Sequence, residues 1–338
     1  MTRAPDDVQP PEGGQPTAPR RRRPFGRADV EARAHGLEED FKVQVAATRA
    51  QFDATQEKIQ ARTGRNLPVA ILIGLVLGGS LLVSLLIIKA LFMIFAALLI
   101  GFTTFELASA LRFAGRKVPR VGSVIAGVAV VPAAFYGGAA GAWLALLGGI
   151  VFVALWRLVE VALPRYRTSV RSFWADLGAG TLVQVYIVFL ASFAVILTAE
   201  PGGQWWTLAF LIVVVGIDTG AYVSGLLFGK HKMAPKISPK KTWEGFAGAT
   251  LAALIAGVLL ALFMLGLPWW TGLVIGIVIL GTATAGDLGE SMIKRDLGIK
   301  DMSSWLPGHG GVLDRLDSIL PSVVGALALF YLFSPLAA

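Results

Sequence analysis

A charge-dense stretch from Asp287 to Ser318 separates two apolar segments of this 338-residue chain. It contains six acidic residues, four basic residues and a glycine-rich turn around His309. Carboxylate oxygens are the ligands that Mg²⁺ prefers, and cationic side chains bind phosphate oxygens. The stretch therefore has the residues needed to hold magnesium and a polyphosphate, although a solvated loop with charges of both signs has a similar composition.

The acids and bases of this stretch fall on shared faces if the flanking segments are helical. Asp287, Ser291 and Lys294 are spaced by four and three residues, which places them on one helical face. Asp314 and Asp317 lie three residues apart at the expected start of the last apolar segment, again on one face. The glycine-rich turn between the two groups can bring Asp314 back towards Asp287.

Asp218 lies inside an apolar run further upstream. An ionised carboxylate at membrane depth costs roughly 2.5–3.5 kcal/mol, so it usually faces a cavity or a partner. We therefore favour a functional Asp218 over the alternative, a packing residue bonded to Tyr222 one helical turn later.

Two adjacent lysines, Lys240 and Lys241, follow Ser238 and Pro239. Serine is a favoured N-cap and proline a favoured first helical residue, so we expect both lysines in the first turn of a helix. Cations there oppose the helix dipole but suit an anion held at the helix N-terminus. The pattern favours triphosphate binding over a loop that is merely positively charged.

The order of these residues resembles the signature of the phosphatidate cytidylyltransferases, or CDP-diacylglycerol synthases. One matching segment reads Ser291-x-x-Lys294-Arg295-x4-Lys300-Asp301 and continues as Pro307-x-His309-Gly310-Gly311-x-x-Asp314-Arg315-x-Asp317. A second comprises Asp218-Thr-Gly-Ala-Tyr222, Phe228-Gly229-Lys230 and Ser238-Pro239-Lys240-Lys241-Thr242-Trp243-Glu244-Gly245. The resemblance is strong from about residue 211 onward, and only a run of hydrophobic helices agrees upstream.

The resemblance implies transfer of the cytidylyl group of CTP to phosphatidic acid, giving CDP-diacylglycerol and pyrophosphate. It implies Mg²⁺, with a second cation left open, and places metal ligation on Asp287 and Asp314, with Asp218 and Asp317 as second choices. His309 has three open roles: protonating pyrophosphate, donating to a phosphate, or capping the turn. The candidates for catalysis or for binding CTP and its phosphates are Lys240, Lys241, Ser291, Lys294, Arg295, Lys300, Asp301, His309 and Arg315.

The composition is typical of an integral membrane protein, because hydrophobic residues make up 55% of the chain and charged residues 15%. The net charge of +8 comes from bases in short loops, which favours membrane orientation over nucleic-acid binding. The absence of cysteine excludes disulfides and thiolate chemistry.

Nine apolar runs approach the roughly 20 residues of a membrane helix, so we predict an all-α polytopic protein. The runs are 68–88, 90–111, 119–136, 139–159, 178–198, 205–227, 246–266, 269–286 and 313–335. Among the loops between them, Lys89 is the one base on the side opposite the other bases, so the positive-inside rule predicts a cytoplasmic N-terminus and an outside C-terminus. Both signature segments then face the cytoplasm, which suggests a bacterial inner-membrane enzyme.

The chain divides into a polar cytoplasmic tail, 1–66, and a transmembrane catalytic domain, 67–338, with the signature region at 211–318. The tail is expected to be partly disordered, and 28–60 has the spacing of a surface helix. Outside the signature, we expect three acids to pair with nearby arginines. These acids are Glu106, Glu160 and Asp176, beside Arg112, Arg157 and Arg171.

Three alternatives remain open from the sequence. A CTP-dependent kinase of polyprenol or phytol shares the membrane setting, an ion-coupled transporter would use Asp218, and a structural anchor explains neither segment. The implied partners are CTP, phosphatidic acid and the bilayer, and a homodimer is left open.

Overall fold

The computed structural model describes residues 67–303, 305 and 310–337. The tail and the surface helix expected within it lie outside the described residues, as does His309. The helices are α2 (Leu67–Leu86), α3 (Lys89–Phe113), α4 (Arg120–Ala162), α5 (Val170–Val183), the π-helical η2 (Gln184–Phe189), α6 (Leu190–Ala199), α7 (Gly203–Phe228), α8 (Trp243–Phe263), α9 (Trp269–Asp296) and α10 (Ile319–Phe333). Short 3₁₀ turns are η1 (Pro164–Tyr166), η3 (Leu313–Arg315) and η4 (Ser334–Leu336).

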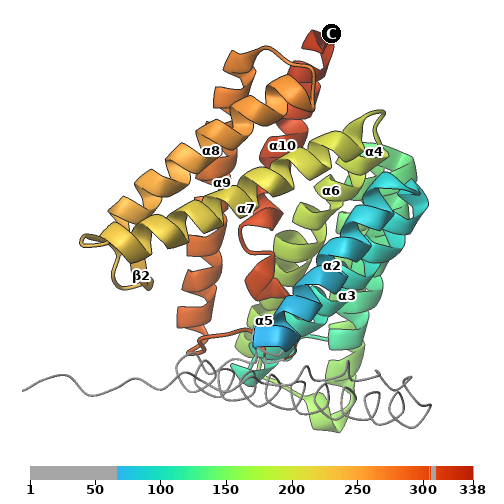
Figure 1. The fold of residues 1–338 in the computed structure, drawn as a ribbon. Helices are drawn as coiled ribbons and strands as arrows, with labels where there is room; N and C mark the ends of the chain where they lie inside the picture. Colours follow the sequence, from blue (N-terminus) through green and yellow to red (C-terminus); the bar gives the residue numbers. More distant parts are fainter. Residues whose placement is uncertain (1–66, 304, 306–309, 338) are drawn as a thin grey trace, which may run out of the picture. The chain divides into compact units, whose positions relative to one another are not determined.

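The helices confirm the predicted polytopic membrane class. Seven helices in the described part of the chain are long and apolar enough to cross a bilayer, and α5, η2 and α6 form one of them. α2 is a further apolar helix of 20 residues. Figure 1 shows α7 and α8 running side by side, with α9 and α10 next to them.

α4 consists of two arms that fold back on each other. The chain reverses at Gly138, where φ is 55° and ψ is −144°, a conformation open to glycine. Across the two arms, a Cβ on Gly122 would lie 3.0 Å from the ring of Trp156, and one on Gly149 would lie 3.3 Å from the Cβ of Ala126. These pairings require antiparallel arms, so each arm corresponds to one of the predicted apolar runs.

Glycines allow α8 to approach both of its neighbours closely. A Cβ on Gly220 of α7 would lie 2.8 Å from the Cβ of Ala252, and one on Gly272 of α9 would lie 2.5 Å from the Cα of Val258. Small residues at such crossings bring helix backbones together in membrane proteins. The three helices therefore form a tight unit, which carries Asp218 on α7 and Asp287 on α9.

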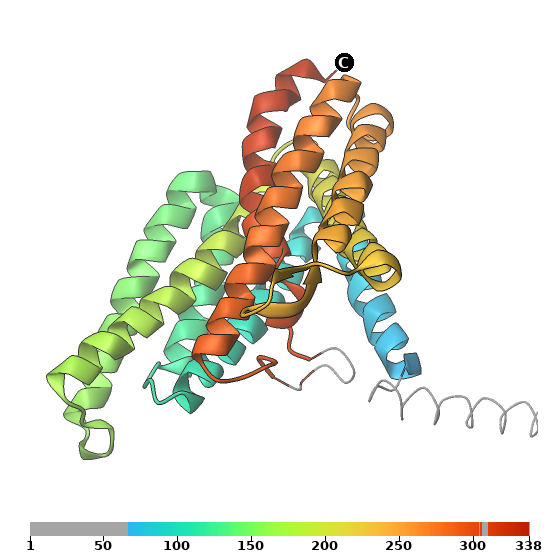
Figure 2. The same cartoon turned by 90° about the vertical axis from the view of Figure 1, so that its left-hand side faces the viewer.

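The helix start predicted at Ser238 is wrong. Residues Ser238–Thr242 form strand β2, which pairs antiparallel with β1 (Lys232–Ala234), and α8 begins at Trp243. Thr242 is the N-cap, since its hydroxyl accepts the N–H of Gly245 at 3.1 Å. Lys240 and Lys241 therefore lie on a short hairpin that crosses beside α9 (Figure 2), and the strand pair is a departure from an all-α fold.

The last two helices differ from the prediction at the ends that carry charge. α9 continues to Asp296, which puts Asp287, Ser291 and Lys294 within one helix as expected. α10 begins only at Ile319, so Asp314 lies in η3 and Asp317 in the turn before α10. The expectation that both acids begin the last helix is wrong, because Leu313–Arg315 form a 3₁₀ turn and residues 316–318 a further turn before α10.

Candidate functional site

A cavity of about 470 Å³ lies between α7, α8, α9 and the hairpin. Its polar lining includes Asp218 from α7, Lys240 and Lys241 from β2, Asp287 from α9 and Ser318 from the start of α10. Lys241 Nζ lies 2.5 Å from Asp287 Oδ2, and both side chains are partly exposed to the cavity. The structure thus brings together a lysine and a carboxylate that the sequence assigned to different halves of the site.

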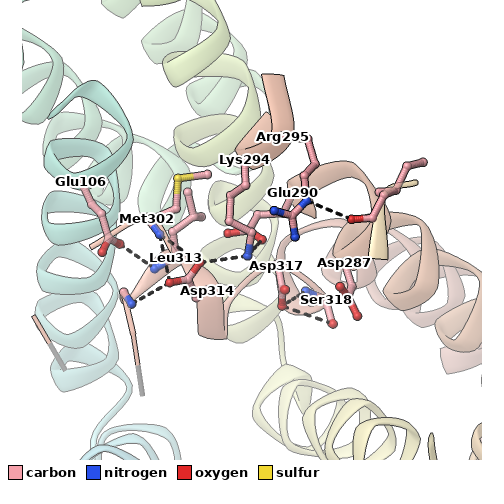
Figure 3. Close-up of polar contacts among 12 residues, drawn as sticks. Glu106, Asp287, Glu290, Lys294, Arg295, Met302, Leu313, Asp314, Asp317 and Ser318 are labelled. Atoms are coloured by element: carbon pink, nitrogen blue, oxygen red, sulfur yellow. Dashed lines mark hydrogen bonds and ion pairs between the residues drawn. The ribbon is translucent and has the colours of Figure 1, made fainter. Parts of the chain in front are cut away.

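Asp317 approaches Asp287 because α9 and the start of α10 cross tightly. Gly286 lies against the Asp317 carbonyl, and a Cβ on it would also meet the Pro321 ring at 2.8 Å. Burial, and then the neighbouring charge of Asp287, raises the pKa of Asp317 to about 7. Figure 3 shows Asp287, Asp317 and Ser318 grouped on one side of the site.

The carboxylates Asp218, Asp287 and Asp317 repel one another, since Asp218 and Asp287 both act on Asp317. Such a group suits a hard divalent cation, and Mg²⁺ characteristically takes one or two carboxylates with substrate phosphates and water. Across 67–303, 305 and 310–337, no three His, Cys, Asp or Glu side chains form a ready metal cage. The three carboxylates provide oxygen donors of the kind that a hard divalent cation prefers.

Asp314 makes a different set of contacts from Asp317. Its Oδ2 accepts the N–H of Gly311 at 2.7 Å and the N–H of Met302 at 3.1 Å, while its Oδ1 accepts Lys294 Nζ at 3.0 Å. Burial alone would raise the pKa of Asp314, but these donors, led by the Gly311 N–H, hold it below the ordinary value. Asp314 therefore links Met302 and Gly311 of the signature loop to each other and to Lys294 of α9.

Lys294 is shared between two acids rather than directed at the cavity. It forms an ion pair with Glu290, one helical turn earlier, and a second with Asp314. Glu290 is fully buried, and Lys294 is its ion-pair partner. The arrangement joins α9 to η3 (Figure 3).

Glu106 holds the signature loop, whereas the sequence favoured its pairing with an arginine over a contribution to the site. Its carboxylate accepts the N–H of Leu313 at 2.7 Å, the N–H of Val312 at 3.2 Å and the hydroxyl of Ser303. The expected pairing with Arg112 is not among its contacts, and Arg112 instead donates to the Val118 carbonyl at 3.1 Å. A buried acid in an apolar run was the available signal, and it carries the same implication as Asp218.

The remaining predicted residues that the structure describes, Arg295, Ser291, Lys300, Asp301 and Arg315, do not line this cavity. Arg295 Nε donates to the Ile237 carbonyl at 3.2 Å and so ties α9 to the hairpin. Ser291 is nearly buried, whereas Lys300 and Asp301 are exposed in the loop after α9. Arg315 lies within electrostatic reach of Asp218, although it comes from η3. The described residues of the signature thus converge from four elements.

Two expected acid pairings outside the signature are confirmed. Arg157 is buried and contacts Asp176 Oδ2 through Nε at 3.2 Å and Nη2 at 2.9 Å, and its Nη1 lies 3.5 Å from Glu160. Glu244 closes a local contact, with His231 Nδ1 2.5 Å from its Oε1. Arg157 thus pairs with both Glu160 and Asp176, whereas Glu244 belongs to the second signature segment and precedes Gly245, which lines the cavity.

Comparison with known proteins identifies the family of the chain. The cytidylyltransferase family model matches residues 68–333, so the chain belongs to that family. A phosphatidate cytidylyltransferase of Mycobacterium bovis is 40% identical over 272 residues, which cover 79% of this chain and 89% of the relative. The protein of the same name from Mycobacterium leprae is 38% identical over 78% of this chain and 88% of its own length. The one from Haemophilus influenzae is 37% identical over 54% of this chain and 67% of its own length.

Proposed function

We propose that the chain is a phosphatidate cytidylyltransferase, which joins CTP and phosphatidic acid to give CDP-diacylglycerol and pyrophosphate. Family membership and 40% identity over most of the chain support the reaction. The observation that carries the proposal is the cavity in which Lys240, Lys241, Asp218 and Asp287 converge. It combines carboxylates for a metal with cations for phosphates, next to apolar helices that adjoin lipid.

Asp287 and Asp317 are the proposed principal metal ligands, with Asp218 as the third acid of the group. Mg²⁺ bound there would neutralise charge on the phosphates of CTP. Asp314 was an equal first choice from sequence, but its contacts with Met302, Gly311 and Lys294 favour a role in holding the loop.

The basic residues have separate proposed tasks. Lys241 and Lys240 bind the phosphates of CTP from the hairpin side, while Arg315 of η3, within electrostatic reach of Asp218, is a further phosphate-binding group. Arginine can hold two phosphate oxygens at once, whereas lysine acts as a point charge. Lys294 and Arg295 position α9 against η3 and the hairpin, through their contacts with Asp314 and Ile237.

The reaction makes modest demands on proton transfer. The phosphate oxygen of phosphatidic acid attacks the α-phosphorus of CTP, and the bond to pyrophosphate breaks. Because that nucleophile is already anionic, the residues need only hold attack in line and offset crowded negative charge. A set of cations and carboxylates without an activated serine or cysteine suits this task.

The proposed topology has nine crossings, with α2 and each arm of α4 crossing once and the site facing the cytoplasm. Two contacts support a common outer end: Lys89 Nζ donates to the Glu200 carbonyl at 2.8 Å, and Tyr331 donates to Glu200 Oε1 at 2.7 Å. Each of these residues lies next to a loop or terminus expected outside. The basic loops then share the opposite end, as the positive-inside rule requires.

The test is an assay of purified, detergent-solubilised protein with phosphatidic acid, α-³²P-labelled CTP and Mg²⁺. Label entering the organic phase, and lost on chelation, supports nucleotidyl transfer. No lipid label from α-labelled CTP, but label transferred from γ-labelled CTP to a polyprenol or phytol, would replace the proposal with a lipid-alcohol kinase. Cation-coupled flux in vesicles without nucleotide would instead support a transporter.

A further inference from the structure

A second cavity, of about 250 Å³, lies among α2, α3, α6, α7 and α10 and is lined almost entirely by apolar side chains. Phe92 and Phe95 of α3, Phe210 of α7 and Leu77 of α2 are among them. This apolar cavity is separate from the cavity lined by Asp218 and Asp287, here called the carboxylate cavity, since the two have no lining residue in common. Its chemistry excludes a nucleotide, because it offers few groups that bind phosphate or a base.

Arg315 is the one charged residue of this lining, and Thr207 the one other polar side chain among the residues described. Arg315 is also close enough to Asp218 to act on it electrostatically, and Asp218 lines the carboxylate cavity. One guanidinium is therefore associated with both spaces. A cation at the edge of an apolar cavity is complementary to an amphiphile with an anionic head and a hydrocarbon tail.

The signature segment separates the two cavities. Val312, Leu316 and Ile319 line the apolar cavity. Asp317, from the same turn, is close to the charges of Asp287 and Asp218, and Ser318 lines the carboxylate cavity. A phosphate near Arg315 would thus be beside the acids, while a chain attached to it would extend along the apolar face of η3 and α10.

We propose that this cavity holds an acyl chain of the phosphatidic acid substrate, with the phosphate at Arg315. The inference rests on the proposed function and adds to it the location of the lipid tail. An amphiphile with a phosphate head has the charge and the apolar chain that this lining matches. A structural membrane lipid would fill the same apolar space, and the test below separates the two.

Gly78 of α2 gives a direct way to fill the cavity. It belongs to the lining, and nothing lies within 4 Å of the position where its Cβ would be. Gly78→Leu therefore adds a side chain without a backbone clash, and it replaces a poor helix former with a good one. Gly79 is the matched control, because it has the same open surroundings on the same helix but does not line the cavity.

The experiment compares kcat/KM for dioleoyl and dihexanoyl phosphatidic acid in the wild type, Gly78→Leu and Gly79→Leu. We expect Gly78→Leu to lower the dioleoyl value by about tenfold relative to the dihexanoyl value, as expected when a hydrophobic pocket is filled. Gly79→Leu should leave the ratio unchanged. Equal losses on both substrates, or no change in the ratio, would overturn the location and indicate a structural lipid.

A labelling measurement tests the same inference without a variant. Phosphatidic acid carrying a diazirine at the end of one acyl chain is irradiated with wild-type protein in the absence of CTP, and labelled peptides are mapped. Labels on the helices around Phe92, Phe95 and Phe210 support the location, and labels confined to other membrane-facing surfaces contradict it. Failure of the wild type to form CDP-lipid from either chain length would instead remove the proposed function itself.

Discussion

Glu106 accepts the backbone N–H of Leu313 at 2.7 Å, although the two residues are 207 positions apart in the chain. The same carboxylate accepts the Val312 N–H and the Ser303 hydroxyl, so one acid from α3 holds two points of the signature loop. Asp314 holds the loop from the other direction, through the N–H groups of Met302 and Gly311. The catalytic signature is therefore fixed by residues that do not themselves line the carboxylate cavity.

Replacing Glu106 should impair catalysis through the position of the loop. Glu106→Gln keeps the size of the side chain but sets an amide N–H₂ against groups that are all donors. An unsatisfied buried donor costs about 1–3 kcal/mol, so we expect kcat to fall about tenfold to a hundredfold. The measurement is the initial rate of CDP-lipid formation, with the KM for CTP and the thermal transition recorded alongside.

Ser303→Ala is the control for Glu106→Gln, because it removes one of the three donors and leaves the acid able to accept the other two. Its kcat should fall less than that of Glu106→Gln. A normal rate in Glu106→Gln would show that the loop keeps its active position without this carboxylate. A fall in melting temperature with unchanged kcat would assign Glu106 to stability alone.

The proposed division between metal ligands and loop residues can be tested by magnesium titration. Asp287→Asn and Asp317→Asn should each raise the Mg²⁺ concentration for half-maximal rate by about tenfold or more, because each removes a proposed ligand. Asp314→Asn should lower kcat while leaving that concentration near the wild-type value. If Asp314→Asn raises the Mg²⁺ concentration for half-maximal rate as much as Asp287→Asn does, Asp314 is a principal metal ligand and the proposed division is wrong.

Much of this organisation follows from local patterns in the sequence. Apolar runs predicted the helices, and the four-and-three spacing of Asp287, Ser291 and Lys294 predicted their shared helix, because both depend on neighbours in the chain. The reversal within α4 also coincides with the break between two predicted runs, at Gly138.

The errors arose where tertiary contacts decide the local structure. Ser238 and Pro239 have the composition of a helix start, yet this segment pairs with β1 as a strand, and Thr242 takes the capping role instead. The different contacts of Asp314 and Asp317 could likewise not be read from their spacing. They depend on which backbone N–H groups the folded loop directs at each acid.

Lys241 should contribute to CTP binding more than other lysines of the hairpin. It lines the carboxylate cavity and contacts Asp287 at 2.5 Å, whereas Lys236 is exposed in the turn between the strands. Lys241→Met should raise the KM for CTP by about tenfold, because a charge-assisted contact to phosphate is lost. Lys236→Met is the matched control and should leave the KM for CTP unchanged. Equal increases in the two variants would show that both lysines act only through the general positive charge of the hairpin.

The buried pair of Arg157 and Asp176 should affect stability and leave substrate binding unchanged. Both side chains are almost fully buried, and Asp176 also accepts the Lys117 N–H at 2.8 Å. Removing one partner leaves the other charged and buried, which typically costs about 3–5 kcal/mol. Asp176→Ala should therefore lower the melting temperature in detergent markedly, while the KM for CTP measured well below the transition stays at the wild-type value. Because Asp176 lines neither cavity, a raised KM with an unchanged melting temperature would require a link from α5 to the nucleotide site that its contacts do not provide.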